Sequence, residues 1–277
     1  MKLKELLKNI PVLACTADPE LEINAVHYDS RKVTEGSLFV AVAGFASDGN
    51  RFIPMAMEKG AAAVLCSRKV GDYPAIYVED PRIALGQIAR EERKRIGMKV
   101  VGVTGSVGKS TTKEMIACVL DGTYRVEKTP VNHNNDIGMP LTLFNIEEST
   151  EAAVIEMGMN HKGEIATLTA VARPVAGLIS NVGVSHIENL GSRENILAAK
   201  LEILEGMKKN SPLIINGDND MLQTVENEDY DIVFFGIDRL NILCGKAVVE
   251  LRRKERHSYR HSAVKIGYDR TEDRRGR

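Results

Sequence analysis

A glycine-rich segment with a single lysine, residues 104–112, combines the residue types that bind phosphate groups. It reads T-G-S-V-G-K-S-T-T and lies between an apolar run and a helical pattern. Its glycines permit a tight turn whose backbone N–H groups point at phosphate oxygens, and the positive end of the following helix dipole faces the same anion. We therefore expect a nucleoside triphosphate and Mg²⁺ at this loop. Its predicted contacts are Gly105, Ser106, Val107, Gly108, Lys109, Ser110 and Thr111.

Two side chains of this segment have specific predicted roles. Lys109 has the length to reach the β- and γ-phosphates, and the hydroxyl of Ser110 is a suitable Mg²⁺ ligand. The spacing T-G-x-x-G-K-S differs from the common pattern G-x-x-x-x-G-K-S, because Gly102 lies one residue too far upstream. The alternative is a strand-to-helix turn with an incidental lysine. The run G-K-S-T-T between a strand pattern and a helix pattern favours the phosphate loop.

Two polar features downstream have residue types suited to a site. Residues 132–138 read N-H-N-N-D-I-G, which is equally compatible with a polar loop of Asx turns. Glu156 directly follows an apolar run at 152–155. The carboxyl ends of strands in a doubly wound sheet face the ligand crevice, and Mg²⁺ accepts one or two protein oxygens beside phosphates. Glu156 is therefore a candidate metal ligand, and the alternative is a helix-capping or salt-bridged glutamate.

Three later features are ambiguous when only residue type is considered. His186 follows a predicted strand, where a lone histidine is more often a hydrogen-bonded loop residue than a ligand. Lys200 has apolar residues three and four positions away on both sides, which is typical of a surface lysine that snorkels. Residues 216–220, N-G-D-N-D, are compatible with an acidic turn.

The elements that must position these residues form two α/β units. Residues 1–97 contain short apolar runs of strand length beside turn residues. Residues 98–243 alternate strand and helix patterns, which predicts a doubly wound, mostly parallel sheet. The predicted strands are 37–42, 61–65, 75–78, 99–103, 152–156, 175–180, 213–215 and 232–235. The predicted helices are 1–10, 50–60, 83–96, 109–120, 163–172, 193–208 and 221–226.

The bulk composition excludes several classes of protein. With 43% hydrophobic and 27% charged residues, the chain has enough apolar material for two cores. A net charge of −1 provides no field that would recruit nucleic acid or an anionic membrane. No run approaches the roughly 18 apolar residues of a membrane span, and residues 1–10 alternate charge with leucine, unlike a signal peptide. The four cysteines form no C-x-x-C pair. We expect reduced thiols and a cytoplasmic protein without membrane insertion or nucleic-acid partner.

The balance of basic and acidic residues changes near the end of the chain. Residues 251–277 carry ten Lys/Arg against four Asp/Glu, which leaves 27 of the 37 basic and 34 of the 38 acidic residues in 1–250. An acidic body and a basic end mark a boundary. We assign residues 244–277 to an atypical basic tail.

In their order along the chain, these segments resemble the motifs of the Mur ligase family. The resemblance covers about residues 20 to 236. It implies an N-terminal UDP-sugar-binding domain over 1–97 and a central ATP-binding domain over 98–243. The segments that carry it are 29–31 (D-S-R), 36–41 (G-S-L-F-V-A), 48–49 (D-G), 104–112, 132–138, 156–161 (E-M-G-M-N-H), 181–186 and 199–203 (A-K-L-E-I).

The resemblance implies an ATP-dependent ligase of peptidoglycan precursor synthesis that joins D-alanyl-D-alanine to UDP-MurNAc-tripeptide. A carboxylate of the sugar-nucleotide peptide would attack the γ-phosphate, giving an acyl phosphate that the amine then attacks. Ser30 and Arg31 correspond to the uridine-diphosphate contacts. Asn132, Asn134 and Asn135 correspond to part of the acyl-substrate site.

The resemblance also implies a catalytic and metal set, of which residue types alone had indicated only Lys109, Ser110 and Glu156. Glu156 and His186 correspond to Mg²⁺ ligands beside Ser110. Lys200 corresponds to a lysine that CO₂ converts to a carbamate, an anion able to ligate metal. Together with Lys109, which would neutralise charge between two anions, His186 and Lys200 form the predicted catalytic group.

Some residues depart from the family pattern. Val107 replaces a polar residue in the phosphate loop, and Asn50 stands where a histidine is usual. After Gly236 the resemblance fades, which favours a truncated or frame-shifted reading over a genuine basic tail. We expect such a chain to bind its ligands but not to complete ligation. The alternatives are the family member that adds the third peptide residue, a non-catalytic nucleotide-binding remnant, and an unrelated P-loop kinase or NTPase.

Overall fold

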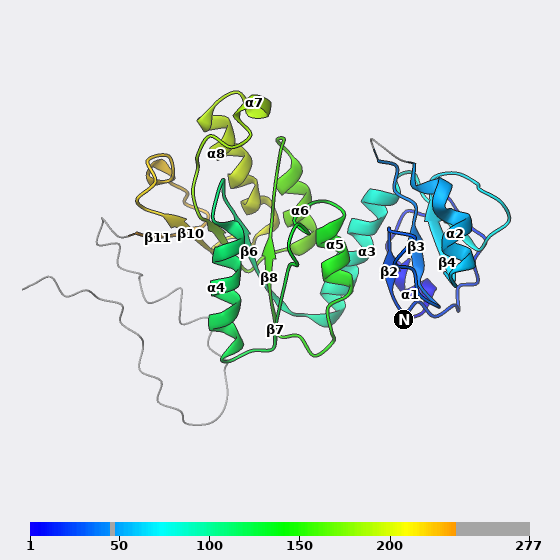
Figure 1. The fold of residues 1–277 in the computed structure, drawn as a ribbon. Coiled ribbons are helices and arrows are strands. Elements are labelled where there is room, and N and C mark those ends of the chain that lie inside the picture. Colours follow the sequence, from blue (N-terminus) through cyan, green and yellow to red (C-terminus); the bar gives the residue numbers. More distant parts are fainter. Residues whose placement is uncertain (45–47, 237–277) are drawn as a thin grey trace, which may run out of the picture. The chain divides into compact units, whose positions relative to one another are not determined.

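The computed structural model describes residues 1–44 and 48–236, which form two β-sheets with helices packed on them (Figure 1). The predicted basic tail, 244–277, lies outside the described residues. In the described ranges, no helix is both long and apolar enough to cross a bilayer.

The N-terminal sheet has five strands in the order β1-β5-β4-β3-β2. Strands β2 to β5 run parallel, and the edge strand β1 is antiparallel to β5. Strands β3 and β4 are buried along their whole length, as expected for apolar strands covered on both faces. The elements of this unit are α1 (Leu3–Leu6), β1 (Ala14–Cys15), β2 (Val26–His27), β3 (Leu38–Val40), η1 (Gly49–Phe52), α2 (Ile53–Glu58), β4 (Ala63–Cys66) and β5 (Ala75–Tyr77).

Helix α3 (Pro81–Ile96) connects the two sheets along the chain. The carboxylate of Asp80 accepts a hydrogen bond from the backbone N–H of Arg82 at 2.7 Å, and Pro81 occupies the first helical position. Both are typical signals of a helix start. The helix ends at Gly97, whose φ of 74° is the left-handed conformation that glycine adopts without strain.

The second sheet has six parallel strands in the order β11-β10-β9-β6-β8-β7. Strand β6 lies between β8 and β9, so the strand order reverses beside it, which is where doubly wound sheets bind ligands. The strands are β6 (Lys99–Thr104), β7 (Val126–Lys128), β8 (Ala152–Glu156), β9 (Ala176–Ile179), β10 (Pro212–Asn216) and β11 (Asp231–Phe235). The helices are α4 (Lys109–Asp121), α5 (Gly138–Phe144), α6 (Glu164–Ala172), α7 (Ile187–Leu190), α8 (Arg193–Leu201), η2 (Glu202–Gly206) and η3 (Leu222–Thr224).

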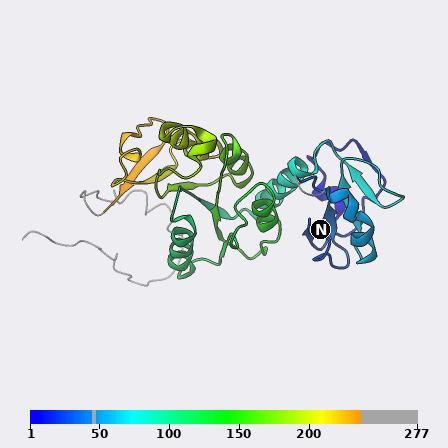
Figure 2. The same cartoon turned by 45° about the horizontal axis from the view of Figure 1, so that its top comes forward.

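Side chains of β6 alternate between two cores on opposite faces of this sheet. Val101 and Val103 pack in a cluster with Ala117 of α4. Val100 belongs to the larger cluster on the other face, which includes residues of α3, α5, α6 and α8. Figure 2 shows α4 alone on its side of the sheet, away from those helices.

Helix α5 closes the core of the N-terminal sheet. Leu141 and Phe144 are buried in one cluster with Leu38 and Val40 of β3 and with Leu85 of α3. The hydrophobic core of the first α/β unit is therefore completed by a helix that the chain contributes only after β7.

The predicted α/β class with mostly parallel sheets is confirmed. The helix expected over 50–60 divides into η1 and α2, and three other predicted helices are also wrong in extent. The helix expected over 1–10 is one turn, α1, because the N–H groups of Leu3 and Lys4 donate to the carbonyls of Leu21 and Pro19 instead of continuing a helix. The helix expected over 221–226 is the short η3, since the chain is already extended at Val225.

The third helix, expected over 193–208, divides at residue 201 into α8 and the tighter η2. The carbonyl of Ile203 accepts a hydrogen bond from Thr169 Oγ1 at 2.8 Å. A Cβ on Gly206 would lie 2.1 Å from the carbonyl oxygen of Thr169, so only glycine fits there. Close packing against α6 therefore replaces the regular helix. Strands β1, β2 and β7 and helices α5 and α7 were not predicted.

Candidate functional site

The phosphate loop is the turn between β6 and α4. Gly105 has a φ of 151° and Gly108 a φ of 81°, both outside the range that other residues favour. A Cβ on Gly105 would lie 1.9 Å from Ser180 Oγ, so a side chain there is excluded by contact as well as by conformation. Both glycines are thus required by the shape of the loop.

The segment after β9 holds this loop in place. The N–H of Ser106 donates to the carbonyl of Asn181 at 3.1 Å, and the N–H of Val107 donates to Asn181 Oδ1 at 2.9 Å. In return, the N–H of Gly183 donates to Ser106 Oγ at 3.0 Å. The tip of the loop is therefore fixed by its neighbour, and the anion-binding donors are the first amides of α4, which have no acceptor within their own helix.

Lys109 begins α4 and turns back over the loop. Its Nζ donates to the carbonyl of Gly105 at 2.9 Å. Burial lowers the pKa of Lys109, and the negative charge of Glu156 opposes this shift. The Lys109 ammonium therefore lies against the backbone of the phosphate loop, and its predicted contact with the phosphates stays a prediction.

Glu156 is buried at the carboxyl end of β8, beside the central strand. Its Oε2 accepts from Ser110 Oγ at 2.9 Å, and its Oε1 accepts from Asn134 Nδ2 at 2.9 Å. Three predicted site residues from separate parts of the sequence therefore meet at one carboxylate. Glu156 does not cap a helix. The alternative of a salt-bridged glutamate is partly right, because Lys113 Nζ lies 3.8 Å from its Oε2.

Lys113 is a residue that the sequence reasoning missed. It is 1% exposed, and its Nζ donates to the carbonyl of Thr129 at 2.6 Å. Lys113 lies four residues after Lys109 on α4, so helical periodicity places both lysines on the same face. That spacing was the signal available in the sequence.

The surface interpretation of Lys200 is wrong. The residue is 1% exposed and belongs to the buried residues of α8, together with Ile196 and Ala199. Burial, and then the positive charge of Lys109, lower the pKa of Lys200 to about 8. No carboxylate in residues 1–44 and 48–236 raises it again. A buried lysine that is easily deprotonated is a reactive amine, not a solvated surface group.

Glu202, two residues after Lys200, fixes the start of α6. Its carboxylate accepts the N–H of Gly163 at 2.7 Å and that of Ala166 at 3.2 Å. These are among the first amides of the helix, which otherwise have no intrahelical acceptor. The segment 199–203 therefore both buries a lysine and holds the helix start opposite the phosphate loop.

The three asparagines of residues 132–138 behave differently. Asn134 reaches Glu156, whereas Asn135 Oδ1 accepts the N–H groups of Ile137 at 3.2 Å and Gly138 at 2.8 Å. The Asx-turn interpretation is therefore right for Asn135. Asn132 is exposed with a φ of 66°, a conformation that asparagine tolerates. His186 also has a positive φ, 65°, and precedes α7.

A depression of about 670 Å³ is lined by residues of the phosphate loop, of the segment 132–138 and of the start of α6. Of the predicted site residues it contains Lys109, Asn134, Asn135 and His186. It does not contain Ser110, Asn132, Glu156 or Lys200. Its remaining lining is Arg82, Asp136, Gly158, Met159, Asn160, Lys162, Gly163, Glu164, Thr167 and Leu168. Arg82, from the N-terminal unit, was not identified from the sequence.

The predicted uridine-diphosphate contacts lie elsewhere, after β2. Ser30 is buried, and its Oγ lies 3.4 Å from Met55 Sδ. The exposed side chain of Arg31 forms a two-point ion pair with Asp29, at 2.9 Å and 2.8 Å. This pairing lowers the pKa of Asp29 to about 2. Neither Ser30 nor Arg31 lines the depression at the phosphate loop.

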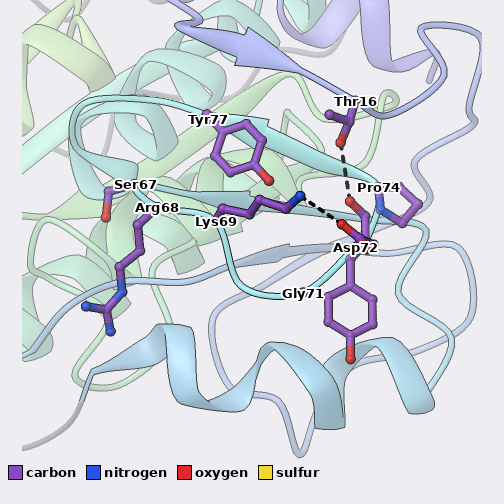
Figure 3. Close-up of a pocket in the computed structure, with 9 residues that line it drawn as sticks. Thr16, Ser67, Arg68, Lys69, Gly71, Asp72, Pro74 and Tyr77 are labelled. Carbon is purple, nitrogen blue, oxygen red and sulfur yellow. Dashed lines mark hydrogen bonds and ion pairs between the residues drawn. The ribbon is translucent and has the colours of Figure 1, made fainter.

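A second depression, of about 710 Å³, lies in the N-terminal unit beneath residues 67–74 (Figure 3). Lys69 reaches across it to Asp72 at 2.8 Å, and Thr16 Oγ1 donates to the carbonyl of Tyr73 at 3.3 Å. Arg68 forms an ion pair with Asp48. None of the predicted site residues lines this depression.

The oxygen donors beside the phosphate loop fit Mg²⁺. Ser110 Oγ and the Glu156 carboxylate are adjacent, and such an ion commonly takes one or two protein oxygens together with substrate phosphates. Within residues 1–44 and 48–236, no three His, Cys, Asp or Glu side chains form a metal-holding cluster. These described residues could thus supply only part of the coordination.

Comparison of the sequence with known protein families identifies the family to which the chain belongs. A sequence profile described as the Mur ligase middle domain matches residues 103–269, and one described as Mur ligase family, catalytic domain, matches residues 22–93. This chain belongs to the Mur ligase family. The middle-domain match ends inside the segment 244–277, whose assignment as a separate tail stays a prediction.

Two curated relatives share the name UDP-N-acetylmuramoyl-tripeptide–D-alanyl-D-alanine ligase. That of Bacillus subtilis is 46% identical over 230 residues, covering 80% of this chain and 50% of the relative. That of Escherichia coli is 41% identical over 201 residues, covering 72% and 44%. The chain therefore spans about half the length of the curated Mur ligases it matches.

Solved Mur ligase structures have the same fold. MurF from Acinetobacter baumannii superposes with a TM-score of 0.80 at 30% identity, covering 85% of this chain and 53% of that one. MurF ligase from Thermotoga maritima in complex with ADP gives 0.73 at 36% identity, covering 78% and 51%.

Proposed function

We propose that this chain carries the sugar-nucleotide and ATP-binding parts of a ligase that joins D-alanyl-D-alanine to UDP-MurNAc-tripeptide. The observation that carries the proposal is the depression that brings Lys109 of the phosphate loop together with Asn134, His186 and Arg82. Such a site can hold a triphosphate and an acyl substrate side by side. The names of the Bacillus subtilis and Escherichia coli relatives give the substrates.

The proposed reaction has two steps. The terminal carboxylate of the tripeptide attacks the γ-phosphorus of ATP, releasing ADP and forming an acyl phosphate. The amine of D-alanyl-D-alanine then attacks the acyl carbon and releases phosphate and a proton, leaving the new amide. Two anions must approach each other in the first step, so fixed positive charge lowers its barrier.

Each residue of the loop has a defined task in this scheme. The amides at the start of α4 bind the phosphates of ATP, and Lys109 leaves the carbonyl of Gly105 to neutralise the γ-phosphate. Ser110 and Glu156 would hold Mg²⁺, which adds charge neutralisation between the phosphates. Asn134 keeps the Glu156 carboxylate oriented by its hydrogen bond at 2.9 Å.

Lys200 contributes as a carbamate. Its neutral amine adds to the carbon of CO₂, and a proton is released to solvent. With a pKa of about 8, about a tenth of the amine is neutral at pH 7, against about one part in three thousand at its ordinary pKa. Burial therefore prepares this lysine for the reaction, and the product is an anion beside Lys109 that, with His186, would complete the metal site.

The N-terminal unit binds the sugar nucleotide in this proposal. Ser30 and Arg31 contact the uridine diphosphate, while Asn132, Asn134 and Asn135 contact the acyl end. We retain 1–97 and 98–243 as the two domains and 244–277 as the basic tail. Because the reaction consumes ATP and a nucleotide-linked precursor, we place it in the cytoplasm.

Calorimetry on the 277-residue chain tests ligand binding. We expect it to bind ATP with Mg²⁺, and to bind UDP-MurNAc-tripeptide more tightly than UDP-MurNAc-dipeptide. Tighter binding of the dipeptide would favour the ligase that adds the third residue, and failure to bind either would overturn the proposal.

A chimaera tests catalysis. Residues 1–236 replace the matched part of the Bacillus subtilis relative, and the purified protein is given ATP, Mg²⁺, UDP-MurNAc-tripeptide and D-alanyl-D-alanine. Mass spectrometry should detect the pentapeptide product, and Lys109→Ala in the same chimaera should abolish it. Binding without product would support a non-catalytic remnant instead.

A further inference from the structure

Arg82 lies at the start of α3 and extends into the depression at the phosphate loop. Its backbone N–H donates to Asp80 Oδ1 at 2.7 Å. One guanidinium nitrogen, Nη1, donates to Asp136 Oδ2 at 3.0 Å, and the other, Nη2, donates to the carbonyl of Ala43 at 3.3 Å. Arg82 is thus the N-terminal unit's contribution to a depression otherwise lined by the central domain.

The hydrogen bonds of this guanidinium are divided between two unlike acceptors. An arginine fork matches a carboxylate best when two parallel N–H groups meet its two oxygens. Here each of the two nitrogens has a separate acceptor, and the Arg82 and Asp136 side chains are 34% and 40% exposed. A solvent-accessible pair of this kind contributes little to stability, so Asp136 is readily exchanged for a better-matched anion.

The charges around the depression favour an anionic ligand near Arg82. Lys109 and Lys162 line it together with Arg82, against the two carboxylates of Asp136 and Glu164. Glu164 is already bonded within its own segment, because its Oε2 accepts the N–H of Asn160 at 2.6 Å. Lys109 belongs to the phosphate loop, whereas Arg82 adds positive charge from a different segment, α3.

We propose that Arg82 binds a carboxylate of the peptide portion of the sugar nucleotide, separate from the carboxylate that is activated. This inference rests on the proposed function, in which that peptide lies between the N-terminal unit and Lys109. The guanidinium releases Asp136 and the Ala43 carbonyl and receives the substrate carboxylate on two N–H groups. Arg82 is then a positioning residue that sets how far the peptide reaches toward the phosphate loop.

Calorimetry with three ligands tests this assignment: UDP, UDP-MurNAc-tripeptide, and the same tripeptide with all its carboxylates converted to amides. For Arg82→Gln we expect the Kd of the tripeptide to rise about 10- to 100-fold, the effect of losing one or two charge-assisted hydrogen bonds. The Kd values of UDP and of the amidated ligand should not change between Arg82→Gln and the unmodified chain. An equal loss for UDP would assign Arg82 to the diphosphate and overturn the proposal.

Asp136→Asn separates substrate binding from a purely structural role. If Arg82 only anchors residues 132–138 through Asp136, both variants should weaken tripeptide binding equally. We expect Asp136→Asn to bind the tripeptide as tightly as the unmodified chain or more tightly, because the guanidinium no longer has to exchange an internal carboxylate. Equal losses in the two variants would refute the proposal.

Two controls keep the result interpretable. Arg95→Gln removes the same charge from the far end of α3, where Arg95 pairs with Glu92 and Glu148, and should leave all three Kd values unchanged. Arg82→Lys keeps the charge but not the fork and should weaken tripeptide binding nearly as much as Arg82→Gln. If the unmodified chain bound no tripeptide, the proposed function would fail; tight binding that Arg82→Gln leaves intact would refute only the role of Arg82.

Discussion

Replacing Lys200 with methionine should make the protein more stable at neutral pH. The Lys200 side chain is 1% exposed and close enough to Lys109 for the two positive charges to repel each other. Methionine has a similar length and no charge, so Lys200→Met removes the buried ammonium while retaining most of the packing. Unlike most core substitutions, this one should raise the free energy of unfolding.

The magnitude follows from the pKa of the lysine in the two states. It is about 8 in the folded protein and 10.5 for the ordinary side chain in the unfolded chain. The folded state therefore disfavours the charged amine by about 3 kcal/mol below pH 8. Between pH 8 and 10.5 the unfolded state binds more protons, so the stability of the unmodified protein rises with pH through this window. The advantage of Lys200→Met should shrink over the same range.

Urea denaturation at several pH values, in buffers freed of CO₂, measures this effect. We expect Lys200→Met to exceed the unmodified protein by about 3 kcal/mol at pH 7 and by much less at pH 10. Adding bicarbonate at pH 8 should stabilise only the unmodified protein, since only it has an amine that can form a carbamate. Lys208→Met, an exposed lysine near the end of η2, is the control and should respond to neither change.

The reasoning would be refuted by a Lys200→Met protein that is less stable than the unmodified one at pH 7 without CO₂. That outcome would mean that the ammonium is stabilised in the folded state. A stability difference that does not vary with pH would show instead that packing, and not charge, determines the effect.

Three further variants test the phosphate loop and the carboxylate beside it. Lys109→Ala should raise the Kd of ATP by about 10- to 100-fold, the loss of charged hydrogen bonds to phosphate; an unchanged Kd by calorimetry would contradict the assignment. Asn181→Ala should raise the Kd of ATP about 10-fold and lower the free energy of unfolding by about 1 kcal/mol, because the amide of Val107 loses its acceptor. A lower free energy of unfolding with an unchanged Kd would show that ATP binding does not depend on the hydrogen bond from Val107 to Asn181. Lys113→Met should lower the free energy of unfolding by about 3 kcal/mol in urea denaturation, because Glu156 stays buried after losing its ion-pair partner. Mg²⁺ should restore part of this free energy. If Mg²⁺ left the stability of the variant unchanged, that result would argue against metal binding at Glu156.

The sequence predicted those features that depend on local pattern. Strand β8 has the predicted bounds, because four apolar residues in a row are followed by a charged one. The phosphate loop was found because glycines at two fixed positions and a lysine at the helix start form a local signal. The N-terminal strands were only partly found, since two-residue strands such as β1 and β2 are too short for alternation to appear.

Features that depend on packing between distant segments could not be predicted. Lys200 was interpreted as a surface residue because its helical neighbours are apolar, and only the fold shows that the lysine itself is buried. The spacing of Lys109 and Lys113 indicates a shared helix face, but the sequence does not show which carboxylate Lys113 meets, and no local signal marks Arg82. Each of the two missed residues is an ordinary lysine or arginine on a helix, and its partner lies 43 or 54 positions away in the sequence, Glu156 for the first and Asp136 for the second.

The strand order of the central sheet has a consequence for synthesis on the ribosome. Strand β6, which leads into the phosphate loop, is the first strand of this sheet to be synthesised, and its two neighbours are β8 and β9. Both edges of β6 therefore stay unpaired until residue 156 has emerged, and the edge that pairs with β9 stays unpaired until residue 179. An apolar strand with open edges is a template for pairing with other chains. Parallel pairing across such sequence separations also forms slowly. The nascent chain is therefore most prone to aggregate, and most dependent on chaperones, while residues 99 to 179 are being translated.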